Sequence, residues 1–197
     1  MTTYLAIDTS TSRTSVAVVI DNQCVWTDYR DGATEHGQSL ATLVKAAISD
    51  HQIIDSVVVG MGPGPYTGLR IGISFARTFA LARGIDINGV NSLDALALNF
   101  HSADFIVATD ARRKEIYWAR YTNSVRVEGP SVDLPETVKS RDLPIYGEGA
   151  MKYSLGAHEN AFPNPALLVT LASDPKNFVD EPLYLRRPDA VATVDRA

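Results

Sequence analysis

The sequence predicts an α/β protein, because short runs rich in β-branched residues alternate with longer segments of helical periodicity. Strand-like runs cover residues 4–8, 14–20 and 23–29, and helical patterns follow at about 35–50 and 68–83. Strands and helices should therefore alternate along the chain.

The first strands and the first helix carry clear local signals. Asp21-Asn22 supplies a short turn between the second and third strands, which predicts an antiparallel meander. Thr34 is the expected N-cap of the helix at 35–50. Apolar residues recur along that helix at the spacing of one face, at Leu40, Leu43, Val44, Ala47 and Ile48.

Strand and helix signals then alternate. A buried strand at 56–59 leads through a glycine-rich loop into the second helix, which should end at Gly84 as its left-handed C′ residue. A strand at 85–90 and a helix over 93–100 follow, and Ser92 is the expected cap of that helix.

The second half of the chain predicts a smaller and more irregular lobe. Residues 104–110 and 115–121 have the pattern of two strands around a short basic turn, and 125–127 could add a third. Frequent prolines break the rest into short pieces. We therefore expect two lobes, residues 1–100 and 101–197.

Composition indicates an ordinary globular protein of 197 residues, with 45% hydrophobic and 21% charged residues. Cys24 is the only cysteine, and no apolar run reaches the ~18–20 residues of a membrane span. The N-terminus lacks the basic and apolar regions of a signal peptide, so a cytoplasmic location without membrane contact is expected. The formal charge is −5, and the tightest basic cluster is Arg112-Arg113-Lys114. Because affinity for RNA depends largely on basic residues that neutralise phosphates, we do not expect this chain to make most of the contacts with any RNA.

The glycine-rich loop at 60–68 fits neither common phosphate motif. No frame gives the P-loop pattern, and the dinucleotide pattern fails because its last position falls on Pro65 or Thr67. Two interpretations stay open: a rigid connector stiffened by proline, which the spacing favours, and a phosphate-binding loop at a helix N-terminus.

Polar residues Asp8-Thr-Ser-Thr-Ser12 end the first strand. They could hold a phosphate and a metal-bound water, or they could form a polar hairpin turn, and spacing alone does not separate these. The histidines form no His-x-x-x-His pair, and no Gly-x-Ser-x-Gly elbow is present.

The second helix has two apolar faces, so it should be covered on most sides. One face is Leu69, Gly72, Ile73, Ala76, Phe79 and Ala80, and the other is Ile71, Phe75, Thr78 and Ala82. The second cover could be the first helix of the same chain or a helix of a partner chain; the sequence favours neither.

The segment Gly60-Met-Gly-Pro-Gly-Pro-Tyr-Thr-Gly-Leu-Arg-Ile-Gly72 resembles the signature of the TsaB (YeaZ) family, which usually reads Gly-Pro-Gly-Ser-Phe-Thr-Gly-Leu-Arg-Ile-Gly. Pro65 and Tyr66 are mild departures from it. Shorter matches follow in family order over essentially the whole chain: Leu5-Ala-Ile-Asp-Thr-Ser10, His36-x-x-x-Leu40, Val90-Asn-Ser-Leu-Asp-Ala-Leu96, Asp110-Ala-Arg-Arg-x-Glu-Ile-Tyr117, Gly147-Glu-Gly149 and Pro182-Leu-Tyr-Leu-Arg186.

This resemblance implies a two-lobed actin-like fold of the ribonuclease H-like, sugar kinase/actin superfamily, with mixed sheets flanked by helices. It also implies a heterodimer with TsaD, cooperation with TsaE in transferring threonylcarbamoyl to the adenosine beside the tRNA anticodon, a homodimer in isolation, and only weak or indirect contact with tRNA. In the family the first two helices make the partner contact. Here that expectation falls on Leu40, Leu43, Val44, Ala47, Leu69, Gly72, Ile73, Ala76, Phe79 and Ala80.

The resemblance further implies a chain without catalytic or metal-binding residues. TsaD holds its metal through a His-x-x-x-His pair, and this chain has His36 but Leu40 at the second position. Residues that would face a phosphate or nucleotide are Asp8, Thr9, Ser10 and Asp110, although position 10 is usually Gly in actin-like ATPases. No cofactor is expected to be required, and ATP or ADP would bind weakly or in a cleft shared with the partner.

Two enzymatic alternatives compete with this scaffold interpretation. An actin-fold ATPase or phosphotransferase would use Asp8 and Asp110 around a metal-bound nucleotide. A metalloprotease (glycoprotease) activity is the weaker alternative, because the helix carries a single histidine.

Overall fold

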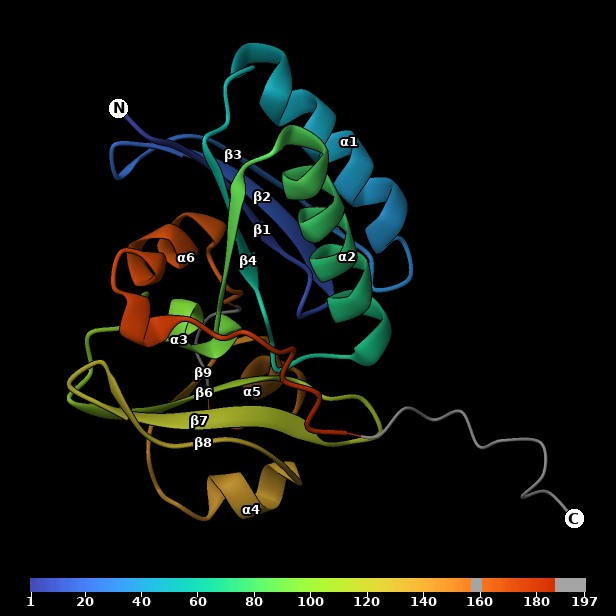
Figure 1. Cartoon of the computed structure of the whole chain (residues 1–197). Coiled ribbons are helices and arrows are strands. Elements are labelled where there is room, and N and C mark those ends of the chain that lie inside the picture. The colour runs from blue at the N-terminus through green and yellow to red at the C-terminus, as the bar shows by residue number, and fades with distance from the viewer. Residues whose placement is uncertain (157–160, 187–197) are drawn as a thin grey trace, which may run out of the picture.

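The computed structural model describes residues 1–156 and 161–186, and it contains two β-sheets with helices above, between and below them (Figure 1). His158, one of the four histidines, and Pro188, one of the prolines that interrupt the second half of the sequence, lie outside the described ranges, as does the end of the predicted second lobe.

The first sheet has the strand order β3-β2-β1-β4-β5. β1 pairs antiparallel with β2 and β2 with β3, whereas β4 is parallel to β1 and β5 to β4. The turn residues Asp21 and Asn22 have φ values of 48° and 65°, so the predicted meander is confirmed. The strands are β1 (Thr3–Asp8), β2 (Arg13–Ile20), β3 (Gln23–Asp31), β4 (Ser56–Gly60) and β5 (Asp86–Val90).

Helices α1 (His36–Asp50) and α2 (Tyr66–Arg83) cover one face of this sheet (Figure 1). Their buried faces join the inward side chains of β1, β2 and β4 in one core that includes Leu5, Val57, Leu40 and Leu69. α2 ends as predicted at Gly84, which has φ 64°. The predicted N-cap Thr34 is wrong, because α1 begins one residue later after Glu35 and has no side-chain cap.

Helix α3 (Ser92–Ala97) is shorter than predicted, and Ser92 is not its cap. The cap is Asn91, whose side chain accepts hydrogen bonds from the backbone N–H groups of Leu93 (2.8 Å) and Asp94 (3.3 Å). The Ser92 hydroxyl donates to Asp8 instead (2.6 Å). A serine that reads as a helix cap in the sequence therefore joins two elements in space.

The second sheet has the order β8-β7-β6-β9, in which β6, β7 and β8 form an antiparallel meander. Its strands are β6 (Asp104–Asp110), β7 (Ile116–Thr122), β8 (Val125–Asp133) and β9 (Ile145–Tyr146). Short helices α4 (Pro135–Lys139) and α5 (Glu148–Lys152) cover its outer face, where Trp118 and Val138 are buried.

The chain finally returns to the first sheet. Helix α6 (Pro165–Ala172) packs Leu168 and Val169 against Ala6, Ala17 and Val58, on the face opposite α1 and α2. The chain continues through a short 3₁₀ turn (Pro175–Asn177), and the N–H of Val179 then donates to the carbonyl of Gly89 in β5 (2.9 Å).

The sequence analysis assigned the segment from α6 to Val179 to the second lobe. In the structure this segment belongs to the first lobe, because the apolar residues of α6 are buried against the first sheet. Helices α3 and α6 consequently lie between the two sheets (Figure 1). Within the described ranges, none of the helices is both long and apolar enough to cross a bilayer.

Candidate functional site

The end of β1 is a closed polar cluster around Asp8, which is only 1% exposed. One carboxylate oxygen accepts from the backbone N–H and the hydroxyl of Ser10 (2.9 and 2.7 Å), and the other accepts from Ser92 (2.6 Å). Burial raises the pKa of Asp8, although these hydrogen bonds oppose the rise. The carboxylate is thus held by its own chain.

The glycine-rich segment closes over the residues after Asp8. A Cβ atom at position 64 would overlap the backbone of Ser10, and one at position 72 would overlap the side chain of Thr9. The Thr9 hydroxyl donates to the carbonyl of Gly68 (2.8 Å), and Thr9, Ser10 and Thr11 are all 2% exposed or less. Of the two interpretations of the glycines, close packing of a rigid connector is the one that these contacts support.

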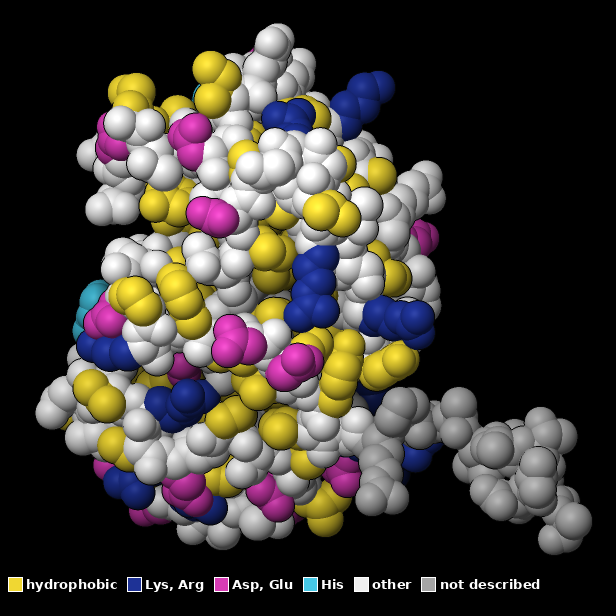
Figure 2. Space-filling view, in the orientation of Figure 1, with side chains coloured by type: hydrophobic (Ala, Val, Ile, Leu, Met, Phe, Trp, Pro, Cys, Tyr) yellow, Lys and Arg dark blue, Asp and Glu magenta, His cyan; other side chains and the backbone are white. Residues whose placement is uncertain are grey.

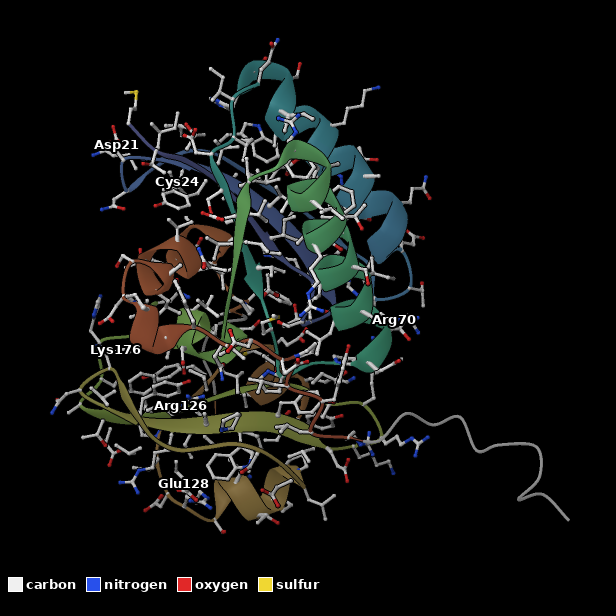
Figure 3. The ribbon with its side chains drawn as sticks, viewed as in Figure 1. Asp21, Cys24, Arg70, Arg126, Glu128 and Lys176 are labelled. Carbon is white, nitrogen blue, oxygen red and sulfur yellow. The ribbon has the colours of Figure 1, made fainter. Side chains whose placement is uncertain are left out.

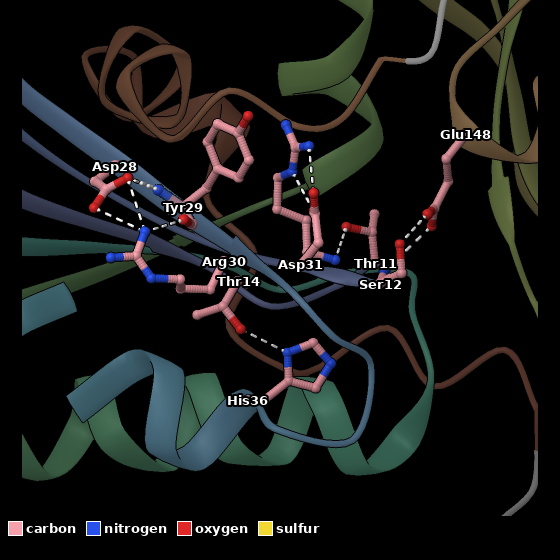
Figure 4. Close-up of polar contacts among 10 residues, drawn as sticks. Thr11, Ser12, Thr14, Asp28, Tyr29, Arg30, Asp31, His36 and Glu148 are labelled. Carbon is pink, nitrogen blue, oxygen red and sulfur yellow. Dashed lines mark hydrogen bonds and ion pairs between the residues drawn. The ribbon is translucent and has the colours of Figure 1, made fainter. Parts of the chain in front are cut away.

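His36, which the family resemblance matches to a metal ligand of TsaD, is a core residue. Its Nδ1 lies 2.8 Å from the Thr14 hydroxyl (Figure 4), and its side chain is 3% exposed. Burial, together with the charge of Arg112, lowers the pKa of His36. A lone histidine at a helix start is more often a surface or capping residue, but His36 is buried because α1 packs against β2. In the part of the chain that the structure describes, no group of three or more His, Cys, Asp or Glu side chains could hold a metal ion.

Asp110 at the end of β6 belongs to a second polar cluster. Its carboxylate accepts from Lys152 (2.6 Å), from the Tyr153 hydroxyl (3.0 Å) and from the backbone N–H of Arg112 (3.1 Å). Partial burial and the bond to Asp110 raise the pKa of Tyr153 to about 12. Asp8 and Asp110 therefore bind separate sets of partners within the chain.

Glu148 links α5 to the segment that follows β1. It is 8% exposed, and its carboxylate accepts from the hydroxyl of Ser12 (2.5 Å), which follows β1 (Figure 4). Burial raises the pKa of Glu148. Sequence reasoning gave this residue no role; the only signal was its place in the short match Gly147-Glu-Gly149.

The predicted partner-binding residues of α1 and α2 are mostly internal. All of them except Phe79 are buried against their own sheet, and Ala76 has 0% exposure. The apolar periodicity of α1 and α2 therefore reflects the packing of these helices against the sheet of their own chain.

The uncovered side of α2 consists of other residues, which we call the outer face of α2. These residues are Thr67, Arg70, Ile71, Ser74, Phe75, Thr78 and Ala82, of which Ile71 and Phe75 are half-buried and the rest exposed. A hollow of about 310 Å³ lies at its N-terminal end, between Tyr66, Arg70 and Ser74. Figure 2 shows apolar side chains interspersed with Lys and Arg over this helix.

A β3-β2-β1-β4-β5 sheet with helices on both faces, joined to a second meander sheet, defines a protein of the actin-like (ribonuclease H-like, sugar kinase) fold. The family model of TsaD, described as tRNA N6-adenosine threonylcarbamoyltransferase, matches residues 30–171. The TsaB of Bacillus subtilis, named a tRNA threonylcarbamoyladenosine biosynthesis protein, is 33% identical over 73% of this chain and 69% of its own length. The chain belongs to the TsaB (YeaZ) family, within the wider group that the TsaD model describes.

Two further comparisons agree. The solved structure of a Pseudomonas aeruginosa protein similar to the peptidase YeaZ superposes with a TM-score of 0.78 and 26% identity, covering 94% of this chain and 100% of that one. A relative from Mycobacterium leprae is 40% identical over 96% of this chain, which spans 56% of that relative's length.

Proposed function

We propose that this chain is a non-catalytic subunit in the formation of threonylcarbamoyladenosine on tRNA. It pairs with TsaD through α1 and α2, cooperates with TsaE, and positions or activates TsaD without doing the chemistry itself. The pathway in this proposal is inferred from the related proteins named TsaB, which are described as tRNA threonylcarbamoyladenosine biosynthesis proteins.

The observation that supports the non-catalytic role is that Asp8, Asp110 and His36, the candidate catalytic groups named from the sequence, all bind partners within the described part of the chain. Asp8 is enclosed by Ser10 and Ser92, and Asp110 is bonded to Lys152 and Tyr153. His36 bonds to Thr14, and Leu40 stands where a second metal ligand would be needed. A carboxylate or imidazole that is buried and already bonded is poorly placed to reach a substrate.

The outer face of α2 supports the pairing. Half-buried apolar side chains such as Ile71 and Phe75 lie beside exposed polar ones, a composition that suits a protein–protein contact. The same face can pair two copies of this chain when TsaD is absent. The partner contact that we propose therefore uses this face in place of the buried residues predicted from periodicity.

The proposal needs no cofactor bound to this chain alone. ATP or ADP would bind weakly or in a cleft shared with TsaD, because the residues after β1 are closed by the chain itself. The cytoplasm is the expected location.

Reconstitution tests the proposal. The cognate TsaD and TsaE, tRNA and threonylcarbamoyl-adenylate are combined with and without this chain, and modified adenosine is counted. We expect modification only when this chain is present with TsaD, and none from this chain alone.

Full modification without the chain would overturn the scaffold role. The same preparation is assayed for ATP turnover, because steady hydrolysis by the chain alone that disappears in Asp8→Ala would favour the phosphotransferase alternative.

A further inference from the structure

The turn between β6 and β7 has an unusual backbone. Arg112, Arg113 and Lys114 have φ values of 64°, 50° and 64°, so three consecutive non-glycine residues adopt the left-handed conformation. This conformation is disfavoured for residues with a Cβ atom, and Asn or Gly usually fills these positions in tight turns. We call these three residues the basic turn. Strain of this kind persists where the surroundings fix it, and it often marks a functional site.

Contacts from two other segments fix the basic turn. On one side, Lys152 and Tyr153 at the end of α5 bond to Asp110 at 2.6 and 3.0 Å. On the other, Arg186 pairs with Glu115 at 2.6 Å. The turn is therefore anchored at both ends and presents its side chains from a rigid base.

Basic side chains outnumber carboxylates here, although the whole chain carries a formal charge of −5. Asp110 lies 2.6 Å from Lys152 and 3.8 Å from Arg112, and Glu115 pairs with Arg186, so two carboxylates face three cations in these pairs. Lys114 is an exposed basic side chain of the same turn. The side chains of Arg112 and Lys152 are 47% and 49% exposed. The charge is thus accessible from solvent.

The basic turn also lies close to the N-terminal end of α2. Tyr184 packs its ring on Tyr66 of α2, with centroids 4.9 Å apart, and Arg186 donates to the carbonyl of Ala111 beside the turn (2.9 Å). Two residues of chain span at most ~7 Å, so these contacts bring the turn close to the start of the outer face. Arg70 extends the positive charge from that end of α2 (Figure 3).

We infer that the basic turn is a phosphate-contact element for the RNA backbone, with Arg112 and Lys114 as its principal donors. Arginine and lysine on a preorganised turn match the charge and geometry of phosphates, and phosphate contacts position an RNA without reading its sequence. The inference rests on the proposed function, which supplies tRNA as the RNA. It assigns this subunit a few contacts within a larger tRNA-binding surface formed with TsaD.

The test compares tRNA binding by the TsaD complex of three forms of this chain: wild type, R112Q/K114Q, and the control K139Q/K176Q. Lys139 and Lys176 are exposed and lie on α4 and in the 3₁₀ turn, away from α1 and α2, so the control removes equal charge elsewhere. Dissociation constants are measured by gel shift between 50 and 300 mM salt. Thermal unfolding and complex formation are checked for each form.

We expect R112Q/K114Q to weaken tRNA binding about 10-fold at low salt and to reduce the slope of log K against log salt by about 1.5, as the loss of two phosphate contacts predicts. The control should change affinity less than 2-fold. Equal tRNA affinity of the two double variants would overturn the inference, and so would loss of TsaD binding in R112Q/K114Q, which would make the turn a protein contact. Reconstitution without the chain separates these results from failure of the proposed function, because full activity there would remove the subunit role altogether.

Discussion

Gly72 shows how a single atom can decide the packing of α2. It lies against Thr9, and a methyl group at this position would overlap the Thr9 side chain. We expect Gly72→Ala to lower the free energy of unfolding by about 1–3 kcal/mol, the usual cost of overpacking. Urea denaturation measures this change.

Gly37→Ala is the matched control for that substitution. Gly37 also lies in a helix, but nothing lies within 4 Å of a Cβ built there. A gain of up to about 1 kcal/mol is expected from helix propensity. Equal stabilities of the Gly72→Ala protein and the wild type would show that the signature glycine is not required for packing.

The buried carboxyl group of Asp8 should make the free energy of unfolding depend on pH. Burial raises its pKa, so the folded chain holds the proton more tightly than the unfolded chain does. The resulting stabilisation is present below the unfolded-state pKa, about 3.9, and is lost as pH rises through the folded-state value. Asp8→Asn keeps the shape without the charge, so its stability relative to wild type should increase between pH 4 and 7.

Denaturation of both proteins across that range gives the difference directly. Asp50→Asn, which changes an exposed carboxyl group, is the control. A difference between Asp8→Asn and wild type that stays constant with pH would mean that burial of Asp8 does not disfavour its charged form.

At the scale of the element, residues that α2 buries against the sheet and residues that it exposes to solvent lie within one turn of the helix. Ser74 is exposed and Ala76 is fully buried against the sheet. We expect Ser74→Arg to leave the chain folded while weakening association with TsaD at least 10-fold, because it places a large charged side chain in the proposed contact. Ala76→Arg should instead unfold the chain, since it buries an unpaired charge.

Calorimetric titration with TsaD, together with circular dichroism of each variant, distinguishes the two effects. Thr170→Arg on α6 controls for an added arginine at an exposed helical site. TsaD affinity that is unchanged by Ser74→Arg would move the contact away from the outer face of α2.

At the scale of the whole molecule, α6 makes the two halves of the chain depend on each other. Leu168 is 0% exposed and packs on the first sheet. It does so although the whole second sheet, residues 104–146, comes before it in the chain. Leu168→Ala should cost about 2–5 kcal/mol. We expect unfolding to shift equally when followed at Trp26 in the first sheet or Trp118 in the second.

Single-tryptophan variants of the Leu168→Ala protein provide these two probes. Leu167→Ala is the matched control, because Leu167 is only partly buried and its truncation should cost less. Two separate transitions would indicate that the lobes fold independently and that α6 does not couple them.

Local signals predicted most helices and strands, since periodicity and turn residues act over a few positions. The Asp21-Asn22 turn, the end of α2 at Gly84 and the β6–β7 hairpin agree with the structure. Caps were less predictable, because Ser92 bonds to Asp8, a residue 84 positions away, in place of its own helix.

For the candidate site too, local patterns predicted some residues, whereas contacts between distant residues could not be predicted. The polar and glycine-rich segments pointed to Asp8 and the glycines, and the family resemblance pointed to Asp110, because all of them lie in short recognisable segments. It could not find the bond between Ser12 and Glu148, which are 136 positions apart. Nor could it predict which apolar residues of α2 face the sheet, because both faces have helical spacing.

The sequence by itself determined the α/β class, the family and the single histidine where TsaD has two, since these depend on residue identity and local order. Only the tertiary structure decided that Asp8 is enclosed by its own chain, that α6 completes the first sheet, and that the basic turn is strained and anchored. Those features arise from contacts between distant segments. Burial and backbone conformation there depend on the packing of the whole molecule, which short-range patterns do not encode.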